Sequence, residues 1–386
     1  MASTAGQEPS KEIISDETTS NTQDAPPLTL LDDAPPFHQA KHTHYVETLA
    51  DQLDGSFEGA LTNHLRLSGV YWSVCTMFLL CGDDLEKVND KMGLISAKDG
   101  KESIVDWVAS CYDEKTGAYG GDTGQEGHVL YTLSALQILA MADCLDRVDK
   151  QKVVQFIAAL QQANGSFVGN AAGEVDTRFS YCALSALSLL NRLGAISLEN
   201  AIDFLQQCHN PLDGGYGSCV GAESHAGQVF CCIGALSIAK ALPENSNKLA
   251  WWLSERQCDS GGLNGRPEKQ ADVCYSWWIL SSMSILGIQD YIDGKKLAAF
   301  ILKAQDPDDG GIADRPDDMA DVFHTFFGIS GLSLLGYLPP QFAQIDPVYA
   351  LPVSVVKRLG LQAEVLVKSG KQVEERLQGY NVVEQK

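Results

Sequence analysis

Two short segments of this 386-residue sequence carry the side chains best suited to bind a metal ion. Asp272 and Cys274 lie two positions apart, and His324 follows later in the chain. A carboxylate, a thiolate and an imidazole can hold zinc and leave its fourth position open, which is the arrangement of a catalytic rather than a structural site. We therefore interpret these three residues as zinc ligands. The alternative interpretation is a capping aspartate, a core cysteine and a core histidine.

Residues suited to bind phosphate lie beside this set. The loop Gly261–Lys269 carries Arg266 and Lys269 just before the first candidate ligand. Arginine binds phosphate as a planar fork and lysine as a point charge. Together with His225 and Tyr275, these donors would hold a diphosphate. The alternative is a solvated loop with ordinary surface charges.

A repeated unit must position these side chains. A short glycine turn recurs five times at intervals of about 48 residues, and a weaker copy at 54–57 opens the array. An amphipathic helix is predicted before each turn and an almost uniformly apolar helix after it, and the sequence shows no strand signals. The turns end at Tyr119, Phe167, Tyr216, Leu263 and Ile312.

Inner helices that are apolar on every side favour a closed ring over an open solenoid, because an open solenoid would leave one of their faces wet. We therefore predict an all-α fold, an α/α barrel (toroid) of five to six helical hairpins with an inner and an outer ring. Nine residues after each turn stands a histidine or an aspartate, and in a ring these positions meet at one end. They are His128, Asp176, His225, Asp272 and Asp321.

The same five positions have a simpler interpretation as helix caps. Aspartate is a good N-cap, so this interpretation stays open for Asp176 and Asp321. Histidine is a poor cap, so we expect His128 and His225 to serve another purpose.

Composition limits the function classes. The formal charge of -22 excludes nucleic acid as a partner, because phosphate binding needs a basic surface. No apolar run approaches the roughly 20 residues that span a bilayer, so we expect no membrane-spanning helix. The 11 cysteines show no pairing pattern and no secretory signal precedes them, which favours a cytoplasmic protein with reduced thiols.

We divide the chain into three parts. Residues 1–40 are polar, acidic and contain proline, so we predict a disordered extension. Residues 41–345 form the predicted barrel domain, and residues 346–386 form a C-terminal extension.

Several of these segments strongly resemble protein prenyltransferase β subunits, and within that family the Rab geranylgeranyltransferase (type II) group. The resemblance covers about residues 42–340. The chain departs from the family pattern in its N-terminal and C-terminal extensions and in the segment near 82–105. The matching segments are Glu223–Gln228, Gly261–Lys269, Asp272–Trp278, Asp314–Pro316 and Asp321–Thr325.

The resemblance implies a role for each matched residue. Asp272, Cys274 and His324 match the ligands of one zinc ion per β subunit, with Tyr275 beside them as a catalytic residue. His225, Arg266, Lys269 and Tyr275 match the diphosphate-binding residues. Asp314 matches a carboxylate that farnesyltransferase associates with magnesium. Arg178 matches an arginine that reads a substrate carboxylate in farnesyltransferase, and its role in this chain stays open.

The resemblance also bears on the lipid. Ser68 falls where farnesyltransferases have a bulky tryptophan, and a small residue there would deepen the pocket for a twenty-carbon chain. With Trp72, Tyr131 and Trp278, it forms the predicted lipid pocket, although ordinary core packing would also explain these aromatic residues.

The implied function is transfer of geranylgeranyl from geranylgeranyl diphosphate to C-terminal cysteines of Rab GTPases. The implied partners are a prenyltransferase α subunit and a Rab escort protein that presents the substrate. The alternatives within the family are a farnesyltransferase or a type I geranylgeranyltransferase β subunit. Outside it they are a non-catalytic helical scaffold and a terpene cyclase, which shares the barrel but needs an Asp-x-Asp-Asp proton donor. We take this motif to be absent from the sequence, which argues against a cyclase.

Overall fold

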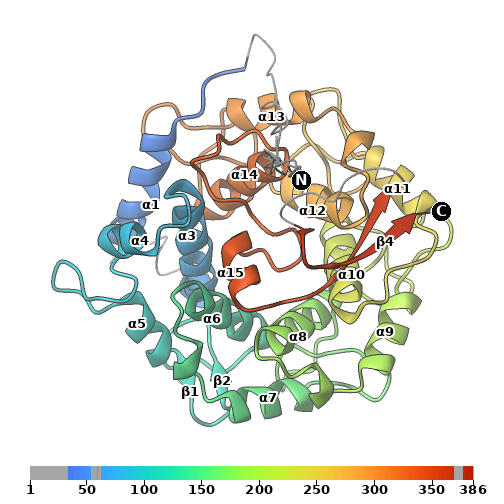
Figure 1. Cartoon of the computed structure of the whole chain (residues 1–386), viewed down its shortest axis with the longest axis horizontal. Coiled ribbons are helices and arrows are strands. Elements are labelled where there is room, and N and C mark those ends of the chain that lie inside the picture. The colour runs from blue at the N-terminus through green and yellow to red at the C-terminus, as the bar shows by residue number, and fades with distance from the viewer. Residues whose placement is uncertain (1–33, 54–58, 60–61, 369–376, 386) are drawn as a thin grey trace, which may run out of the picture.

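The computed structural model describes residues 34–53, 59, 62–368 and 377–385. Its helices form two concentric rings (Figure 1). Each inner helix packs against the next, and the last packs against the first, which closes the ring and confirms the predicted α/α barrel. In the described part of the chain the inner helices are α3 (Arg66–Leu80), α6 (Val129–Met141), α8 (Thr177–Leu189), α10 (Ala226–Ala239), α12 (Tyr275–Ile285) and α14 (Val322–Leu334).

Apart from α1, the helices of the outer ring are shorter than those of the inner ring. In α9 (Leu198–Gln207), for example, Ala201, Phe204 and Leu205 are buried, as the helical spacing of apolar residues requires. The outer helices are α1 (Gln39–Leu53), α5 (Ile104–Ser110), α7 (Lys150–Ala159), α9 (Leu198–Gln207), α11 (Asn247–Ser254) and α13 (Gly294–Lys303). Helix α4 (Leu85–Met92) lies within the segment 82–105 and contacts α3. None of the described helices combines the length and apolar character needed to cross a membrane.

The glycine turns fit closely against the outer helix of the next hairpin. A Cβ atom at Gly261 would lie 2.6 Å from the Lys296 carbonyl oxygen of α13, and Gly261 also has a positive φ of 88°. The last turn meets the first helix instead, since a Cβ at Gly310 would lie 2.4 Å from the Lys41 oxygen of α1. The start of the chain therefore completes the outer ring beside the last repeat.

Contacts with the barrel begin before residue 40, where we predicted the boundary of the barrel domain. Residues 1–33 and the weak repeat copy at 54–57 lie outside the described residues. Within the described part, the segment before α1 is already bound to the barrel. Gln305 Nε2 donates to the Pro36 carbonyl at 3.1 Å, and the rings of Phe37 and Phe342 pack 5.8 Å apart.

The segment after residue 345 closes the far end of the ring. Helix α15 (Val353–Arg358) lies over the ring centre (Figure 1), and Val348, Tyr349 and Leu351 are buried. Tyr71 and Tyr181 of the inner ring donate to carbonyl oxygens of this segment. The barrel thus continues past the boundary we predicted at 345, because an irregular segment has no periodicity that a sequence pattern could register.

Short strands complete the structure, although we predicted none from the sequence. β1 (Tyr112–Asp113) pairs with β2 (Ala118–Tyr119), and β3 (Glu364–Lys368) pairs in parallel with β4 (Asn381–Gln385). Strand β3 contacts α10 and α12.

Candidate active site

Four of the five repeated positions are the N-caps of the inner helices that follow them: His128, Asp176, His225 and Asp321. Asp272 accepts a similar bond, but from the N–H of Cys274, the residue just before α12. A side-chain oxygen or Nδ1 of each of the four accepts from a backbone N–H of the first turn, so the capping interpretation is correct for them. This includes both histidines, which we expected to cap poorly. The bonds run to His128 from Leu130 (3.1 Å), to Asp176 from Arg178 (2.8 Å), to His225 from Gly227 (3.1 Å), to Asp272 from Cys274 (2.8 Å) and to Asp321 from His324 (2.9 Å).

Capping uses only one polar atom of each side chain. Because both histidines accept through Nδ1, Nε2 carries the hydrogen in the neutral ring and can act as a donor. The second polar atom of each of these side chains can therefore contact other groups at the end of the barrel where the inner helices begin.

The candidate zinc ligands come together at this end. The ligand atoms of Asp272, Cys274 and His324 all lie within 4.8 Å of one another, and His324 Nε2 is 3.3 Å from Asp272 Oδ1. Among the residues that the structure describes, this is the only group of three or more such side chains that could hold a metal ion. Cys274 is the residue just before α12, where the chain is still turning, so its sulfur and the Asp272 carboxylate point the same way.

The electrostatics of this group favour a cation. Burial and the neighbouring Asp272 carboxylate raise the pKa of Cys274, against the lowering that a helix N-terminus favours. Burial lowers the pKa of His324, but hydrogen bonds to Asp272 and Asp321 outweigh it and raise the pKa to about 9. A divalent cation would offset both effects, since it stabilises the thiolate and replaces the proton on the imidazole. The donor set of oxygen, sulfur and nitrogen fits zinc.

Three of the four candidate diphosphate ligands gather next to the metal ligands. Tyr275 Oη lies 3.2 Å from His225 Nε2, and Arg266 lies close enough to lower the pKa of His225, although burial is the larger cause. Burial raises the pKa of Tyr275 to about 12, so its hydroxyl stays protonated. With Nε2 of His225 as the donor, the Tyr275 hydrogen is free to point outward to a ligand.

The loop that carries Arg266 and Lys269 is shaped around Tyr275. A Cβ atom at Gly265 would lie 2.3 Å from the Tyr275 ring, so only glycine fits there. Asn264 Nδ2 donates to the Lys269 carbonyl at 2.9 Å and holds the loop together. Arg266 forms an ion pair with Glu223, and Lys269 lies exposed at the end of the loop.

Two further charged residues have partners of their own. Arg178 Nη2 lies 2.9 Å from Asp176 Oδ2. Both Nε and Nη2 of Arg315 donate to Asp314 Oδ2, at 3.0 and 2.6 Å. Asp314 is thus occupied by a guanidinium, and it does not belong to the group that could hold an ion.

The predicted lipid-pocket residues lie in the first turns of the inner helices. Ser68 is buried, and its Oγ lies 3.1 Å from that of Ser134 on α6. Trp72, Tyr131 and Trp278 are partly exposed, whereas the later turns of these inner helices are almost fully buried. This exposure at the helix starts marks the open end of the ring.

Two phenylalanines complete this aromatic group. Phe323 packs on Trp72 with ring centroids 5.0 Å apart, and Phe327 packs on Trp278 at 4.5 Å. We did not select them from the sequence, although their spacing of four places both on one face of α14.

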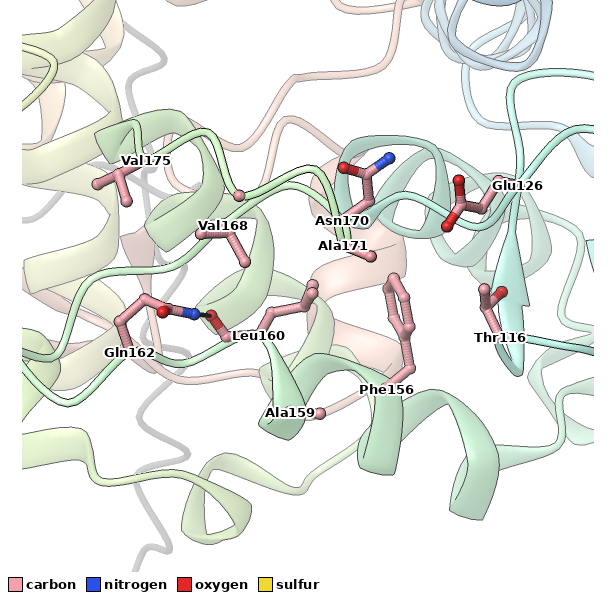
Figure 2. A pocket seen from close by; sticks show the side chains of 11 residues that line it. Thr116, Glu126, Phe156, Ala159, Leu160, Gln162, Val168, Asn170, Ala171 and Val175 are labelled. Atoms are coloured by element: carbon pink, nitrogen blue, oxygen red, sulfur yellow. Dashed lines mark hydrogen bonds between the residues drawn. The ribbon is translucent and has the colours of Figure 1, made fainter.

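A separate cavity of about 490 Å³ lies outside the ring of candidate residues. Figure 2 shows Phe156 of α7 and Leu160, the residue after this helix, facing Val168 and Asn170 across it. None of the predicted site residues lines this cavity, so it is not part of the candidate site.

The Asp-x-Asp-Asp pattern of a terpene cyclase does occur, at 306–309, although our argument against a cyclase assumed that it is absent. The structure places it in the last glycine turn, where Asp306 Oδ1 accepts from the backbone N–H groups of Asp308 and Asp309. Asp308 and Asp309 are exposed. The pattern therefore builds a turn rather than a buried proton donor.

Comparisons with known proteins agree with this geometry. Residues 37–351 match the model of the prenyltransferase alpha-alpha toroid domain. The geranylgeranyl transferase type-2 subunit beta of Saccharomyces cerevisiae is 47% identical over 338 residues, covering 86% of this chain and 97% of that protein. The subunit beta 1 of Arabidopsis thaliana is 49% identical over 320 residues, covering 83% and 94%.

Solved structures share the fold. The Candida albicans protein geranylgeranyltransferase-I complexed with GGPP has a TM-score of 0.70 at 21% identity, covering 84% of this chain and 98% of that one. A type II terpene cyclase from Scytonema has a TM-score of 0.52 at 13% identity, covering 78% and 99%. At such identities the likeness concerns architecture alone.

Proposed function

The chain belongs to the prenyltransferase alpha-alpha toroid family, and from this premise we propose that it is the catalytic β subunit of a type 2 geranylgeranyl transferase. The observation that carries the proposal is the meeting of Asp272, Cys274 and His324, whose ligand atoms lie within 4.8 Å of one another. Relatives that are 47% and 49% identical and carry this name support the choice within the family.

The proposed reaction joins a protein cysteine to an isoprenoid. Zinc held by Asp272, Cys274 and His324 would lower the pKa of the substrate thiol, so that the thiolate forms at neutral pH. The sulfur forms a bond to the first carbon of geranylgeranyl diphosphate, and the bond from that carbon to the diphosphate oxygen breaks. The electron pair of that bond leaves with the diphosphate.

The diphosphate residues act on the charge that develops as this bond breaks. Tyr275 donates its hydroxyl hydrogen, which the His225 hydrogen bond orients outward. Arg266 exchanges Glu223 for a phosphate oxygen, and Lys269 adds a second positive charge. Preorganised donors of this kind accelerate the reaction when they bind the transition state more strongly than the ground state.

The isoprenoid would extend from this group between Trp72, Tyr131 and Trp278. Ser68 leaves the depth that a twenty-carbon chain requires, and each buried CH₂ contributes about 0.8 kcal/mol. Magnesium at Asp314 fits the structure poorly because Arg315 already holds that carboxylate, so we derive no step from magnesium.

The proposed partners follow from the family. A prenyltransferase α subunit would complete the enzyme, and Rab GTPases would arrive on an escort protein in the cytoplasm. The acidic composition excludes nucleic acid, since the formal charge is -22.

The test is co-expression of the full chain with a prenyltransferase α subunit, followed by metal analysis and transfer assays with fifteen- and twenty-carbon diphosphates. We expect one zinc per heterodimer and a preference for the twenty-carbon donor. The variant Cys274→Ser should lose both zinc and transfer, whereas the matched control Cys182→Ser, a buried inner-helix cysteine outside the metal group, should keep both. Full transfer without bound metal would refute the proposal.

A further inference from the structure

Among the five repeated positions, Asp321 differs from the others in the backbone hydrogen bond that it accepts. His128, Asp176, His225 and Asp272 each accept from the backbone N–H two residues ahead. Asp321 accepts instead from the N–H three residues ahead, which is that of His324, at 2.9 Å.

This difference brings the second carboxylate oxygen of Asp321 onto the ring of the residue it caps. Asp321 Oδ2 lies 2.6 Å from His324 Nδ1, while Nε2 on the other side of the ring lies 3.3 Å from Asp272 Oδ1. One carboxylate therefore holds both the backbone and the imidazole of His324. Because Nδ1 donates its hydrogen to Asp321, the neutral ring would direct the lone pair of Nε2 toward Asp272 and Cys274.

The backbone of Asp321 is itself fixed. Its N–H donates to the Ile312 carbonyl at 3.3 Å, and its carbonyl accepts from Thr325 Oγ1 at 2.6 Å. Thr325 Oγ1 in turn accepts from the N–H of Ile312 at 2.8 Å. The last glycine turn and the first turn of α14 thus clamp Asp321 from both sides, so its carboxylate has little freedom to leave His324.

We propose that Asp321 is a positioning residue for the metal site. Asp321 sets the tautomer and the orientation of His324 without binding the ion. Carboxylate partners of ligating histidines raise the basicity of the ligand, and their loss typically lowers metal affinity 10- to 100-fold. The inference rests on the proposed function, since it concerns zinc at Asp272, Cys274 and His324.

The test measures zinc affinity by competition with a chromogenic chelator, using the heterodimer with its α subunit. Asp321→Asn keeps an oxygen that can cap α14 but removes the negative charge, so we expect its zinc dissociation constant to rise about 10- to 100-fold. Asp321→Glu should recover part of the loss. The matched control is Asp176→Asn, which makes the same change in a capping residue away from the metal group, and its zinc affinity should equal that of the wild type.

A second readout separates positioning from folding. Cobalt in place of zinc reports the ligand geometry through its visible absorption, and we expect the spectrum of Asp321→Asn, but not of Asp176→Asn, to change. A zinc dissociation constant within twofold of the wild type in a folded Asp321→Asn heterodimer would overturn the inference. If the wild type itself binds no zinc, or Cys274→Ser retains it, the proposed function fails instead.

Discussion

The imidazole of His42 and the side-chain amide of Gln305 lie 2.8 Å apart in the protein interior, although 263 positions separate them in the chain. His42 Nδ1 also accepts from the N–H of Gly311 at 3.0 Å. Gln305 accepts from the N–H of His38 as well and donates to the Pro36 carbonyl. This group joins α1 to the last repeat and so closes the outer ring, and it requires a neutral imidazole.

The first prediction is that ring closure weakens in acid. Burial lowers the pKa of His42 from 6.5 to about 4, against the smaller raising effect of Gln305. The unfolded chain therefore binds more protons than the folded one between these values, so the stabilisation is complete above pH 6.5 and is lost as the pH falls toward 4. The full effect is on the order of 3 kcal/mol.

Hydrogen exchange of the α1 amides from pH 7 to pH 4.5 measures this effect. We expect protection to fall with pH in the wild type and to be almost independent of pH in His42→Asn, whose amide can accept from Gly311 without titrating. His44→Asn, an exposed change on the same helix, is the control and should follow the wild type. Protection that stays constant with pH in the wild type would contradict the prediction.

The second prediction concerns the Tyr275 hydroxyl. Tyr275→Phe keeps the ring that packs on Gly265 and removes only the donor beside His225. Because this donor acts on charge that develops in the transition state, kcat should fall by roughly one to two orders of magnitude while geranylgeranyl diphosphate affinity changes little.

The control for this change is Tyr131→Phe, at the corresponding place in an earlier repeat beside His128. We expect a much smaller effect on kcat there, since Tyr131 lies away from the metal ligands. Single-turnover transfer and equilibrium diphosphate binding separate the two parameters. Equal losses in the two variants would show that the hydroxyl of Tyr275 has no special role.

The third prediction concerns lipid length. Ser68 is buried in the first turn of α3 against Ser134, so Ser68→Trp would fill the space beside it. One isoprene unit of five carbons is worth up to about 4 kcal/mol when buried, at about 0.8 kcal/mol per carbon. We expect the dissociation constant of the twenty-carbon diphosphate to rise at least tenfold and that of the fifteen-carbon compound to change little.

Ser134→Ala serves as the control here, because it removes the hydroxyl contact without adding volume. Both affinities should stay near the wild-type values in this variant. If Ser68→Trp weakened the two diphosphates equally, Ser68 would not set the length of the pocket.

The sequence was sufficient to predict the ring and the meeting of Asp272, Cys274 and His324, because a repeat converts spacing along the chain into position around a circle. The same register indicated that Asp321 stands at the position equivalent to Asp272, but it did not indicate that Asp321 contacts His324. An N-cap side chain can accept from the backbone N–H two or three residues ahead. Which of the two it does depends on backbone angles, and these cannot be read from the residue types. That choice decides whether the second carboxylate oxygen reaches His324.

The segment after residue 345 was beyond prediction for a different reason. Val348, Tyr349 and Leu351 are apolar in an irregular stretch, and such a stretch has no period that distinguishes a buried plug from a surface loop. Its place is fixed by single hydrogen bonds from Tyr71 and Tyr181, which lie far away in the sequence. Contacts of this kind become visible only in three dimensions.

The last prediction concerns Asp346, which holds this segment in shape. Its side chain is fully buried, accepts from the N–H groups of Val348 and Tyr349 through Oδ1, and accepts from the Tyr380 hydroxyl through Oδ2 at 2.6 Å. Asp346→Ala leaves three buried donors without their acceptor, at about 1–3 kcal/mol each. We expect a loss of at least 3 kcal/mol in the free energy of unfolding.

Tyr380→Phe removes one of these bonds and leaves the two backbone bonds intact, so its loss should be about 1–3 kcal/mol and smaller than that of Asp346→Ala. Denaturant unfolding measures both variants, and zinc content provides the control, because the metal ligands lie at the opposite end of the inner helices. Retained zinc with a large loss of stability in Asp346→Ala would show that the plug supports the barrel and not the site. Equal stability of Asp346→Ala and the wild type would mean that Asp346 does not hold the far end of the ring closed.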